Sequence, residues 1–165
     1  MKIQTVMFVL LGMMFLFARV TSARQVTTDY DRSAHFAEYR TYSWLHVETR
    51  DPLSVDRIKH AVNATLAAKG WTQVDSGADV SIVALEITRD QQTLDTFYDG
   101  VGGGWGWTYK VGTVVIDLFD TRTKQLLWRG AASDTLSDNS NTNIKNLDEG
   151  VDRMFKQFPP SATKK

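Results

Sequence analysis

The stretch VVIDLFDTRTKQLLWRGAAS, residues 114–133, predicts a β-hairpin and with it the fold class of the chain. Its first half, together with Thr113, is rich in β-branched and aromatic residues, which favour a strand over residues 113–119. Residues 120–124 have the composition of a tight turn. Residues 125–133 then return as an antiparallel strand, because so short a connection cannot bring the chain back for a parallel pairing.

Asp117 and Arg129 fall on facing strands of this hairpin. The sequence leaves the register of the hairpin open, so the two residues pair either directly or diagonally. A cross-strand pair of opposite charges stabilises a sheet by about 0.2–1 kcal/mol. We therefore interpret the pair as a stabilising contact rather than a catalytic one.

Apolar patterning outside the hairpin predicts two helices and four further strands. Asp51-Pro52 is typical of a helix start, and the apolar residues after it recur with helical spacing until Gly70. A second helix is expected to begin near Thr142 or Asn143 and to end before Pro159. The further strands are expected at residues 25–31, 41–45, 71–74 and 80–87.

These elements indicate an α+β protein, built as a two-layer sandwich in which a mostly antiparallel sheet carries both helices on one face. The segment at residues 80–87 is apolar on both faces until Glu86, which is typical of a central strand. We expect a single α+β domain over residues 24–160 and a flexible C-terminal tail at residues 161–165.

Residues 1–23 have the build of a secretory signal peptide. A positive charge near the start precedes an apolar run at residues 6–18, and Thr21 and Ala23 are small residues that suit a signal-peptidase site. The apolar run is shorter than the ~20 residues of a membrane-spanning helix. We therefore expect cleavage after Ala23, no transmembrane span after signal removal, and a soluble exported protein that is periplasmic or secreted.

The composition excludes several classes of protein. The chain has 165 residues with 19 basic and 19 acidic side chains, so its formal net charge is zero and it lacks the basic surface that nucleic-acid binding requires. Hydrophobic residues make up 42% of the chain, which argues against disorder throughout. There is no cysteine, which excludes disulfides, thiolate metal sites and the cysteine-linked lipid anchor of bacterial lipoproteins.

Four segments of the chain carry a family resemblance: residues 29–45, 57–71, 77–83 and 114–133. In the last of these, Asp117, Asp120, Trp128, Arg129 and Gly130 form an Asp…Asp…Trp-Arg-Gly pattern. Taken in order, the segments resemble a bacterial exported family known as domain of unknown function 4136.

The resemblance covers about residues 29–160. It implies an envelope protein, a lipoprotein in many members, with no established activity and therefore no catalytic residues to carry over. The sequence departs from that pattern by lacking the lipidated cysteine, which favours a soluble form. The Trp-Arg-Gly element is best interpreted as structural.

No spacing in the sequence is typical of a catalytic, metal or cofactor site. The three histidines, His35, His46 and His60, form no zinc-binding pattern, and there is no Gly-x-Ser-x-Gly motif. The glycine run at residues 99–107 is followed by a strand, whereas a phosphate-binding loop opens into a helix. We therefore expect no catalytic residues, no metal site and no cofactor.

Residues 138–149 match a calcium-binding loop in part. Asn143 and Lys145 stand where that loop requires a glycine and an apolar residue. We therefore interpret the segment as a polar loop that caps the last helix.

Five aromatic residues lie in or beside the glycine-rich segment DGVGGGWGW, residues 99–107. In one interpretation they fold back and cover the open face of the sheet, with glycine permitting the turns. In the other they form an exposed contact site for a partner protein, a glycan ring or a membrane interface. The candidate binding residues are Phe97, Tyr98, Trp105, Trp107 and Tyr109.

These observations favour a non-enzymatic exported envelope domain of uncharacterised role. Its expected partner is an envelope protein or a component of the cell wall or outer membrane. The alternative is a hydrolase whose acid and base are scattered residues such as Asp117, Glu86 and His46.

Overall fold

The predicted hairpin forms part of a six-stranded sheet in the computed structural model, which describes residues 25–93 and 107–159. At residues 90–93 and 107–109 the description covers the backbone alone. The helices are α2 (Pro52–Ala68) and α3 (Ser140–Phe155), and a short 3-10 helix, η2, spans Phe36–Glu38. The strands are β1 (Gln25–Tyr30), β2 (Thr41–Glu48), β3 (Thr72–Gln73), β4 (Val80–Thr93), β5 (Trp107–Asp120) and β6 (Leu126–Thr135).

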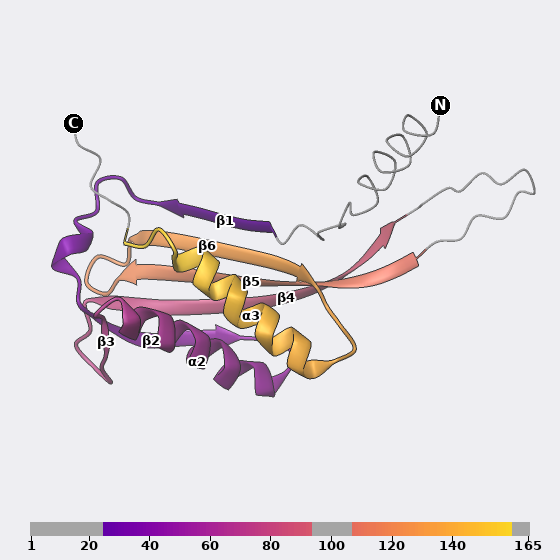
Figure 1. Cartoon of the computed structure of the whole chain (residues 1–165). Coiled ribbons are helices and arrows are strands. Elements are labelled where there is room, and N and C mark those ends of the chain that lie inside the picture. The colour runs from indigo at the N-terminus through magenta and orange to yellow at the C-terminus, as the bar shows by residue number, and fades with distance from the viewer. Residues whose placement is uncertain (1–24, 94–106, 160–165) are drawn as a thin grey trace, which may run out of the picture.

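The sheet is mixed, with the strand order β1-β6-β5-β4-β2-β3 (Figure 1). The pairs β1–β6, β6–β5 and β5–β4 are antiparallel, whereas β4–β2 and β2–β3 are parallel. The parallel pairs arise because α2 carries the chain back along the sheet between β2 and the strands that follow it. The α+β class is therefore confirmed, and the sheet is mixed, with parallel pairs beside the antiparallel pairs that the sequence predicts.

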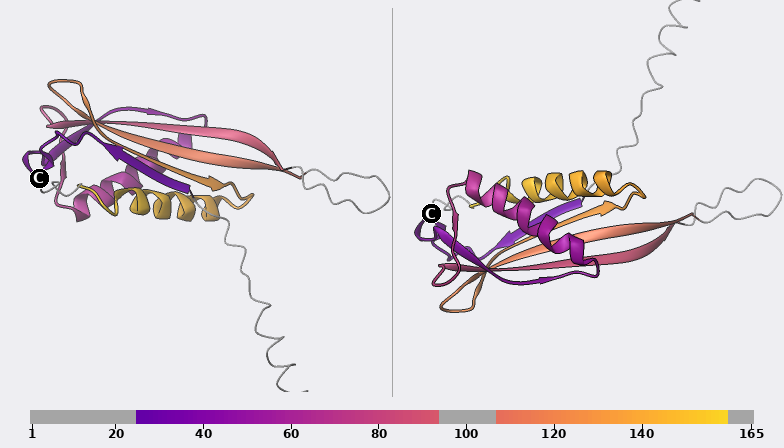
Figure 2. Two further views of the ribbon diagram at one scale, coloured as in Figure 1. Left: turned by 90° about the horizontal axis from the view of Figure 1, so that it is seen from above. Right: turned by 90° about the horizontal axis from the view of Figure 1, so that it is seen from below.

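Both helices lie against the same face of the sheet, and no helix of residues 25–93 or 107–159 lies on the opposite face (Figure 2). The helices contact each other, and α3 also contacts β6 and β1. Asp51 caps α2 as predicted, because its side chain accepts a hydrogen bond from the Leu53 N–H at 3.0 Å.

An aromatic cluster forms the centre of the core between the sheet and the helices. Trp128 is 2% exposed, and its ring centroid lies 4.6 Å from that of Phe155 and 5.4 Å from that of Phe158. The indole of Trp128 lies over Gly130, so any side chain at position 130 would collide with the ring. This packing gives the Trp-Arg-Gly element the structural role that the sequence predicted.

The boundaries of β4, β5 and α3 differ from those that the sequence predicts. β4 and β5 continue well beyond residues 80–87 and 113–119, because the two strands pair along their whole lengths, from Val80 with Asp120 to Thr93 with Trp107. α3 begins at Ser140 rather than near Thr142 or Asn143.

Candidate binding groove

The side chains on the helix-covered face of the sheet become smaller toward the end from which β4 and β5 continue. One row of paired residues across the strands is bulky and consists of Tyr30, Trp128, Leu118 and Ile82. Four residues further along each strand, on the same face, the row consists of Val26, Ala132, Val114 and Glu86. The sheet therefore loses side-chain volume toward this end.

The apolar face of α3 loses contact with the sheet in the same direction. Val151, Met154 and Phe155 in its C-terminal half are buried, whereas Ile144 and Leu147 nearer its start are only half-buried. Gly150 lies close to the sheet, since a Cβ at this position would lie 3.2 Å from the Cβ of Ala132. From Gly150 toward the start of α3, side chains fill the space between the helix and the sheet only in part.

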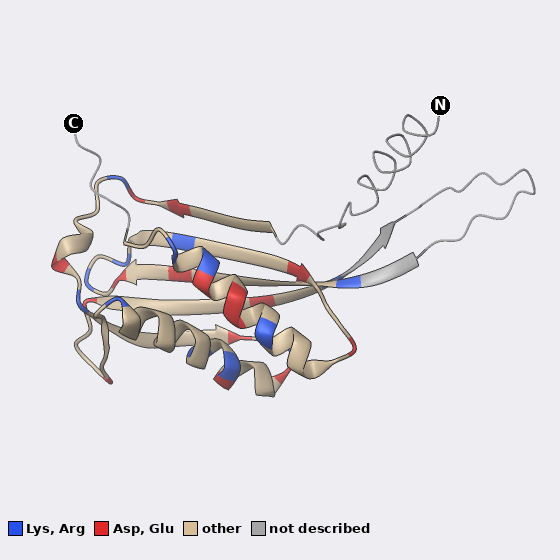
Figure 3. Cartoon of the chain, in the orientation of Figure 1, with Lys and Arg blue, Asp and Glu red and all other residues tan. Residues whose placement is uncertain are grey.

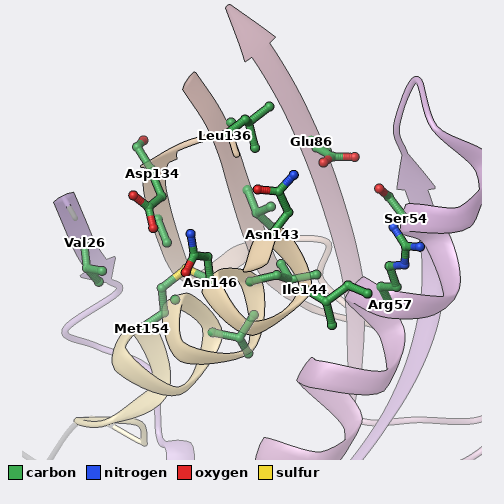
Figure 4. Close-up of a pocket in the computed structure, with 17 residues that line it drawn as sticks. Val26, Ser54, Arg57, Glu86, Asp134, Leu136, Asn143, Ile144, Asn146 and Met154 are labelled. Atoms are coloured by element: carbon green, nitrogen blue, oxygen red, sulfur yellow. The ribbon is translucent and has the colours of Figure 1, made fainter. Parts of the chain in front are cut away.

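A groove of about 90 Å³ occupies this space between α3, the start of α2 and the sheet (Figure 4). Val26, Val114 and Ala132 form its floor, and Ile144 and Leu147 lie along its roof. Polar side chains surround the opening, and Figure 4 shows Glu86 of β4 between the two helices. The polar residues are Ser54, Arg57, Glu86, Asp134, Asn143 and Asn146.

Hydrogen bonds and an ion pair hold part of this polar rim in place. The Thr49 hydroxyl donates a hydrogen bond to Glu86. Arg57 lies 3.8 Å from the Asp51 carboxylate, so the residue that caps α2 also positions this cation. Asn143 accepts a hydrogen bond from the Ser137 N–H and donates one to the Ser137 carbonyl, both at 2.8 Å. The mouth of the groove thus presents a carboxylate and a guanidinium beside an apolar interior.

Charged residues elsewhere on the helices do not form a single-sign surface. Figure 3 shows acidic and basic residues interspersed along α3, in agreement with the zero net charge of the chain. Within residues 25–93 and 107–159, no group of three histidine, aspartate or glutamate side chains could hold a metal ion.

The three residues of the hydrolase alternative lie on opposite faces of the sheet. Glu86 lines the groove beneath α3, whereas Asp117 and His46 line a depression on the face without helices. Asp117 is paired directly with Arg129, which donates hydrogen bonds from Nε and an NH2 group to the two carboxylate oxygens at 2.6 Å each. These hydrogen bonds and the negative charge of Asp117 raise the pKa of Arg129. The geometry does not combine these three residues in one site.

The aromatic candidate residues are placed only in part. Trp107 and Tyr109 lie in β5, where their backbones pair with Thr93 and Gln91. Their side chains lie outside the described residues, as do Phe97, Tyr98 and Trp105 entirely. Both interpretations of the aromatic residues, a cover over the sheet and an exposed contact site, therefore stay predictions.

The sequence indicates Glu86 as a candidate residue but does not indicate the groove around it. The groove depends on small residues inside regular elements: Gly112 in β5, Ala132 in β6 and Gly150 in α3. Glycine in the interior of a strand or helix is unfavourable unless a close approach requires it. Glycines inside a strand and a helix are therefore the sequence signal that could have indicated a close approach near the groove.

Comparisons with known proteins identify a family and similar folds. Residues 26–160 match the family described as Domain of unknown function (DUF4136). A PDZ domain protein from Parabacteroides distasonis is similar in structure, with 15% identity and a TM-score of 0.56 over 82% of this chain, which spans only 35% of that protein. The PelC dodecamer from Paraburkholderia phytofirmans has 13% identity and a TM-score of 0.53 over 81% of this chain and 96% of that one.

A third structure, lipoprotein GNA1162 from Neisseria meningitidis, matches with 11% identity and a TM-score of 0.44, over 72% of this chain and 99% of that one. No curated protein sequence matches this chain. Within the described residues, no helix has the length and apolar character needed to cross a membrane.

Proposed function

Because the chain belongs to the family described as Domain of unknown function (DUF4136), we propose that it is a non-enzymatic domain of the bacterial envelope that binds a protein or an envelope component. The proposed binding site is the groove beneath α3. We further propose that the domain is a two-layer sandwich, in which the sheet forms one layer and the two helices form the other.

The shape and chemistry of the groove carry this proposal. Ligand sites in proteins are concave, mostly apolar, and carry a few polar groups that orient the ligand. Here the apolar floor and roof meet a mouth that carries Glu86 and Arg57. Drug-sized ligands fill pockets of about 300–1,000 Å³, so a groove of about 90 Å³ suits one apolar side chain or a short hydrocarbon segment. We propose that such a group enters the groove while its polar attachment contacts the mouth.

The position of β1 supports export as a cleaved protein. β1 begins at Gln25, two residues after the predicted cleavage site at Ala23. Removal of residues 1–23 would therefore leave every described strand of the sheet intact. Since the chain has no cysteine for a lipid anchor, we propose a soluble periplasmic or secreted form.

The aromatic residues Phe97, Tyr98, Trp105, Trp107 and Tyr109 remain a second proposed contact site of the same binding protein. If they serve recognition, the double variant Trp105→Ser/Trp107→Ser should keep its melting temperature and lose about 2 kcal/mol or more of binding free energy toward an envelope partner. A much lower melting temperature would instead indicate that these side chains cover the sheet.

The groove can be tested with n-hexanol, which offers a short hydrocarbon chain with one polar end. Methyl-resolved NMR spectra of the protein should show shifts confined to residues such as Val114, Ile144 and Leu147 as the alcohol is added. Ile144→Trp should fill the mouth of the groove and reduce these shifts at Val114 and Leu147.

A matched control is Leu53→Trp, since Leu53 is 66% exposed and does not line the groove. This variant should respond to n-hexanol like the unmodified protein. Shifts spread over the whole core, or an unchanged response in Ile144→Trp, would contradict the groove as a binding site.

A further inference from the structure

The outer edge of β1 carries backbone groups that no strand of the described chain pairs with. Among the described strands, β1 is the terminal strand of the sheet and pairs only with β6. Just after β1, the Asp31 N–H donates to the Leu127 carbonyl at 2.9 Å in the same register. Residues of an antiparallel strand alternate between bonding one neighbour and the other. The outward groups therefore belong to Val26, Thr28 and Tyr30.

The Tyr30 backbone confirms this alternation. Its N–H donates to the Asp29 carboxylate at 2.9 Å instead of to β6. The outward donor at Tyr30 thus has a local acceptor that another strand could replace.

The two edges of the sheet differ in how they are protected from pairing. At the opposite edge, β3 covers the first two residues of β2, and a register shift between Trp44 and His46 interrupts the strand at the 66% exposed Leu45. Bulges, lysines and prolines are the usual devices that prevent edge pairing. β1 pairs with β6 without a register shift, and its sequence QVTTDY contains neither lysine nor proline.

We propose that β1 binds β1 of a second copy of this chain in an antiparallel pair centred on Thr28. A pair in which the centre falls on Thr28 places Val26 opposite Tyr30 of the second copy. All three outward residues of each copy then exchange N–H···O=C bonds with outward residues of the other. Centring the pair on a neighbouring residue would leave some of these groups outside the pair, so the backbone selects this register.

The side chains fit the same register. On the helix-covered face, Val26 lies beside the aromatic ring of Tyr30 from the second copy, twice by symmetry, and the two Thr28 side chains face each other. On the other face, Thr27 lies opposite Asp29, so the two Asp29 carboxylates are not directly opposed. Aromatic–aliphatic and threonine pairs are favourable across strands, whereas directly opposed like charges are not.

This pairing joins two sheets into one and leaves the helices of both copies on the same face. Since Val26 lines the groove beneath α3, Tyr30 of the second copy would extend the groove wall at the seam. The proposed pairing is independent of the proposed binding function, because it is argued from the backbone and side chains of β1.

Sedimentation velocity of the protein purified after expression of the full chain tests the pairing. We expect a dimer that dissociates on dilution. Thr28→Pro removes one outward N–H and leaves the β1–β6 bonds intact, so this variant should be monomeric. Thr28→Ala keeps the N–H and should remain a dimer. A monomer at protein concentrations up to about 1 mM, or a dimer in Thr28→Pro, would overturn the proposal.

Cross-linking tests the register, because the chain has no cysteine of its own. Thr28→Cys places two thiols directly opposite each other, about 5.5 Å apart at Cα, within the reach of a disulfide. Thr27→Cys places them diagonally, at about 7–8 Å, beyond that reach. We expect a covalent dimer under oxidation only for Thr28→Cys. Equal cross-linking of both variants, or none, would contradict this seam, and binding of β1 to another protein alone would give none.

Discussion

At the scale of single residues, the sequence predicted the role of residues that act on their neighbours in the chain. Asp51 caps α2 as expected, and Gly70 follows this helix with a φ of 80°, a conformation that favours glycine. The sequence identified Glu86 as the end of an apolar run, but it could not identify the residues that surround Glu86 in the structure. The roof and the far rim of the groove come from residues 54–57 and 143–154, which no local pattern links to Glu86.

Replacement of Trp128 by alanine should lower the free energy of unfolding by about 3–5 kcal/mol. The indole is 2% exposed and packs against Phe155 and Phe158, so its loss opens a cavity at the centre of the core. Urea denaturation gives the measurement, with Leu45→Ala as a control at an exposed position, where the change should stay within about 0.5 kcal/mol. A loss below about 1 kcal/mol for Trp128→Ala would be inconsistent with this packing.

Asp120 makes the stability of the fold depend on acid pH. Its carboxylate accepts hydrogen bonds from the Thr123 N–H at 2.7 Å, the Arg122 N–H at 2.9 Å and the Tyr39 hydroxyl at 3.0 Å. These bonds, the one from Thr123 above all, lower the pKa of Asp120 in the folded protein. The ionised carboxylate therefore stabilises the fold above the unfolded-state pKa of about 3.9, and this contribution is lost as the pH falls through the lower folded-state pKa.

Asp120→Asn should weaken this pH dependence, because the amide keeps an acceptor oxygen but cannot take up a proton. Urea denaturation between pH 7 and about pH 3 should show a shallower loss of stability for this variant than for the unmodified protein. Asp75→Asn, in an exposed turn, is the matched control and should retain the original pH profile. Identical profiles for all three proteins would exclude a role of Asp120 in acid sensitivity.

At the scale of elements, the hairpin and both helices were predicted, whereas the lengths of β4 and β5 were not. The sequence after Ile87 turns polar, with Thr88, Arg89 and Asp90 in succession, and this composition is more typical of a loop. The strands nevertheless continue, because pairing with the neighbouring strand supplies the hydrogen bonds that composition does not reveal. Strand length here is a property of the pair rather than of either segment.

The start of α3 provides a test at this scale. The Asn139 side chain accepts hydrogen bonds from the N–H groups of Asn141 at 2.9 Å and Thr142 at 3.4 Å. Asn139→Ala should therefore lower the free energy of unfolding by about 1 kcal/mol. Asn141→Ala, exposed in the first turn, should change it by less than about 0.5 kcal/mol in the same denaturation experiment. Equal effects would show that Asn139 does not act as the cap.

At the scale of the whole molecule, the sequence predicted the α+β class and the family, but not the parallel part of the sheet or the groove. The order of strands depends on where β3 and β4 are placed beside β2 after α2, and no residue pattern specifies that choice. The groove depends on how α3 packs against the small side chains of the sheet near Ala132 and Gly150. Both features arise from packing between distant segments.

Export is a property of the full chain and can be tested directly. When the full chain is expressed in a bacterium with a periplasm, mass spectrometry of the periplasmic fraction should find a protein that begins at Arg24. Leu11→Arg interrupts the apolar run and should leave an unprocessed chain in the cytoplasm. An intact Met1 in the membrane fraction of the unmodified protein would show that residues 1–23 are an anchor instead.

The pairing of β1 with β6 has a consequence for how the protein acquires its structure. Gln25 pairs with Ser133, so the first strand must wait for a partner about a hundred residues later in the chain. Contacts between such distant segments slow folding, because a long loop must close before they form. If the chain crosses a membrane amino end first, β1 emerges early and stays without its partner until almost all of the domain has followed. Completion of the sheet is then a late step of biogenesis, and a chaperone that shields extended segments would act during that interval.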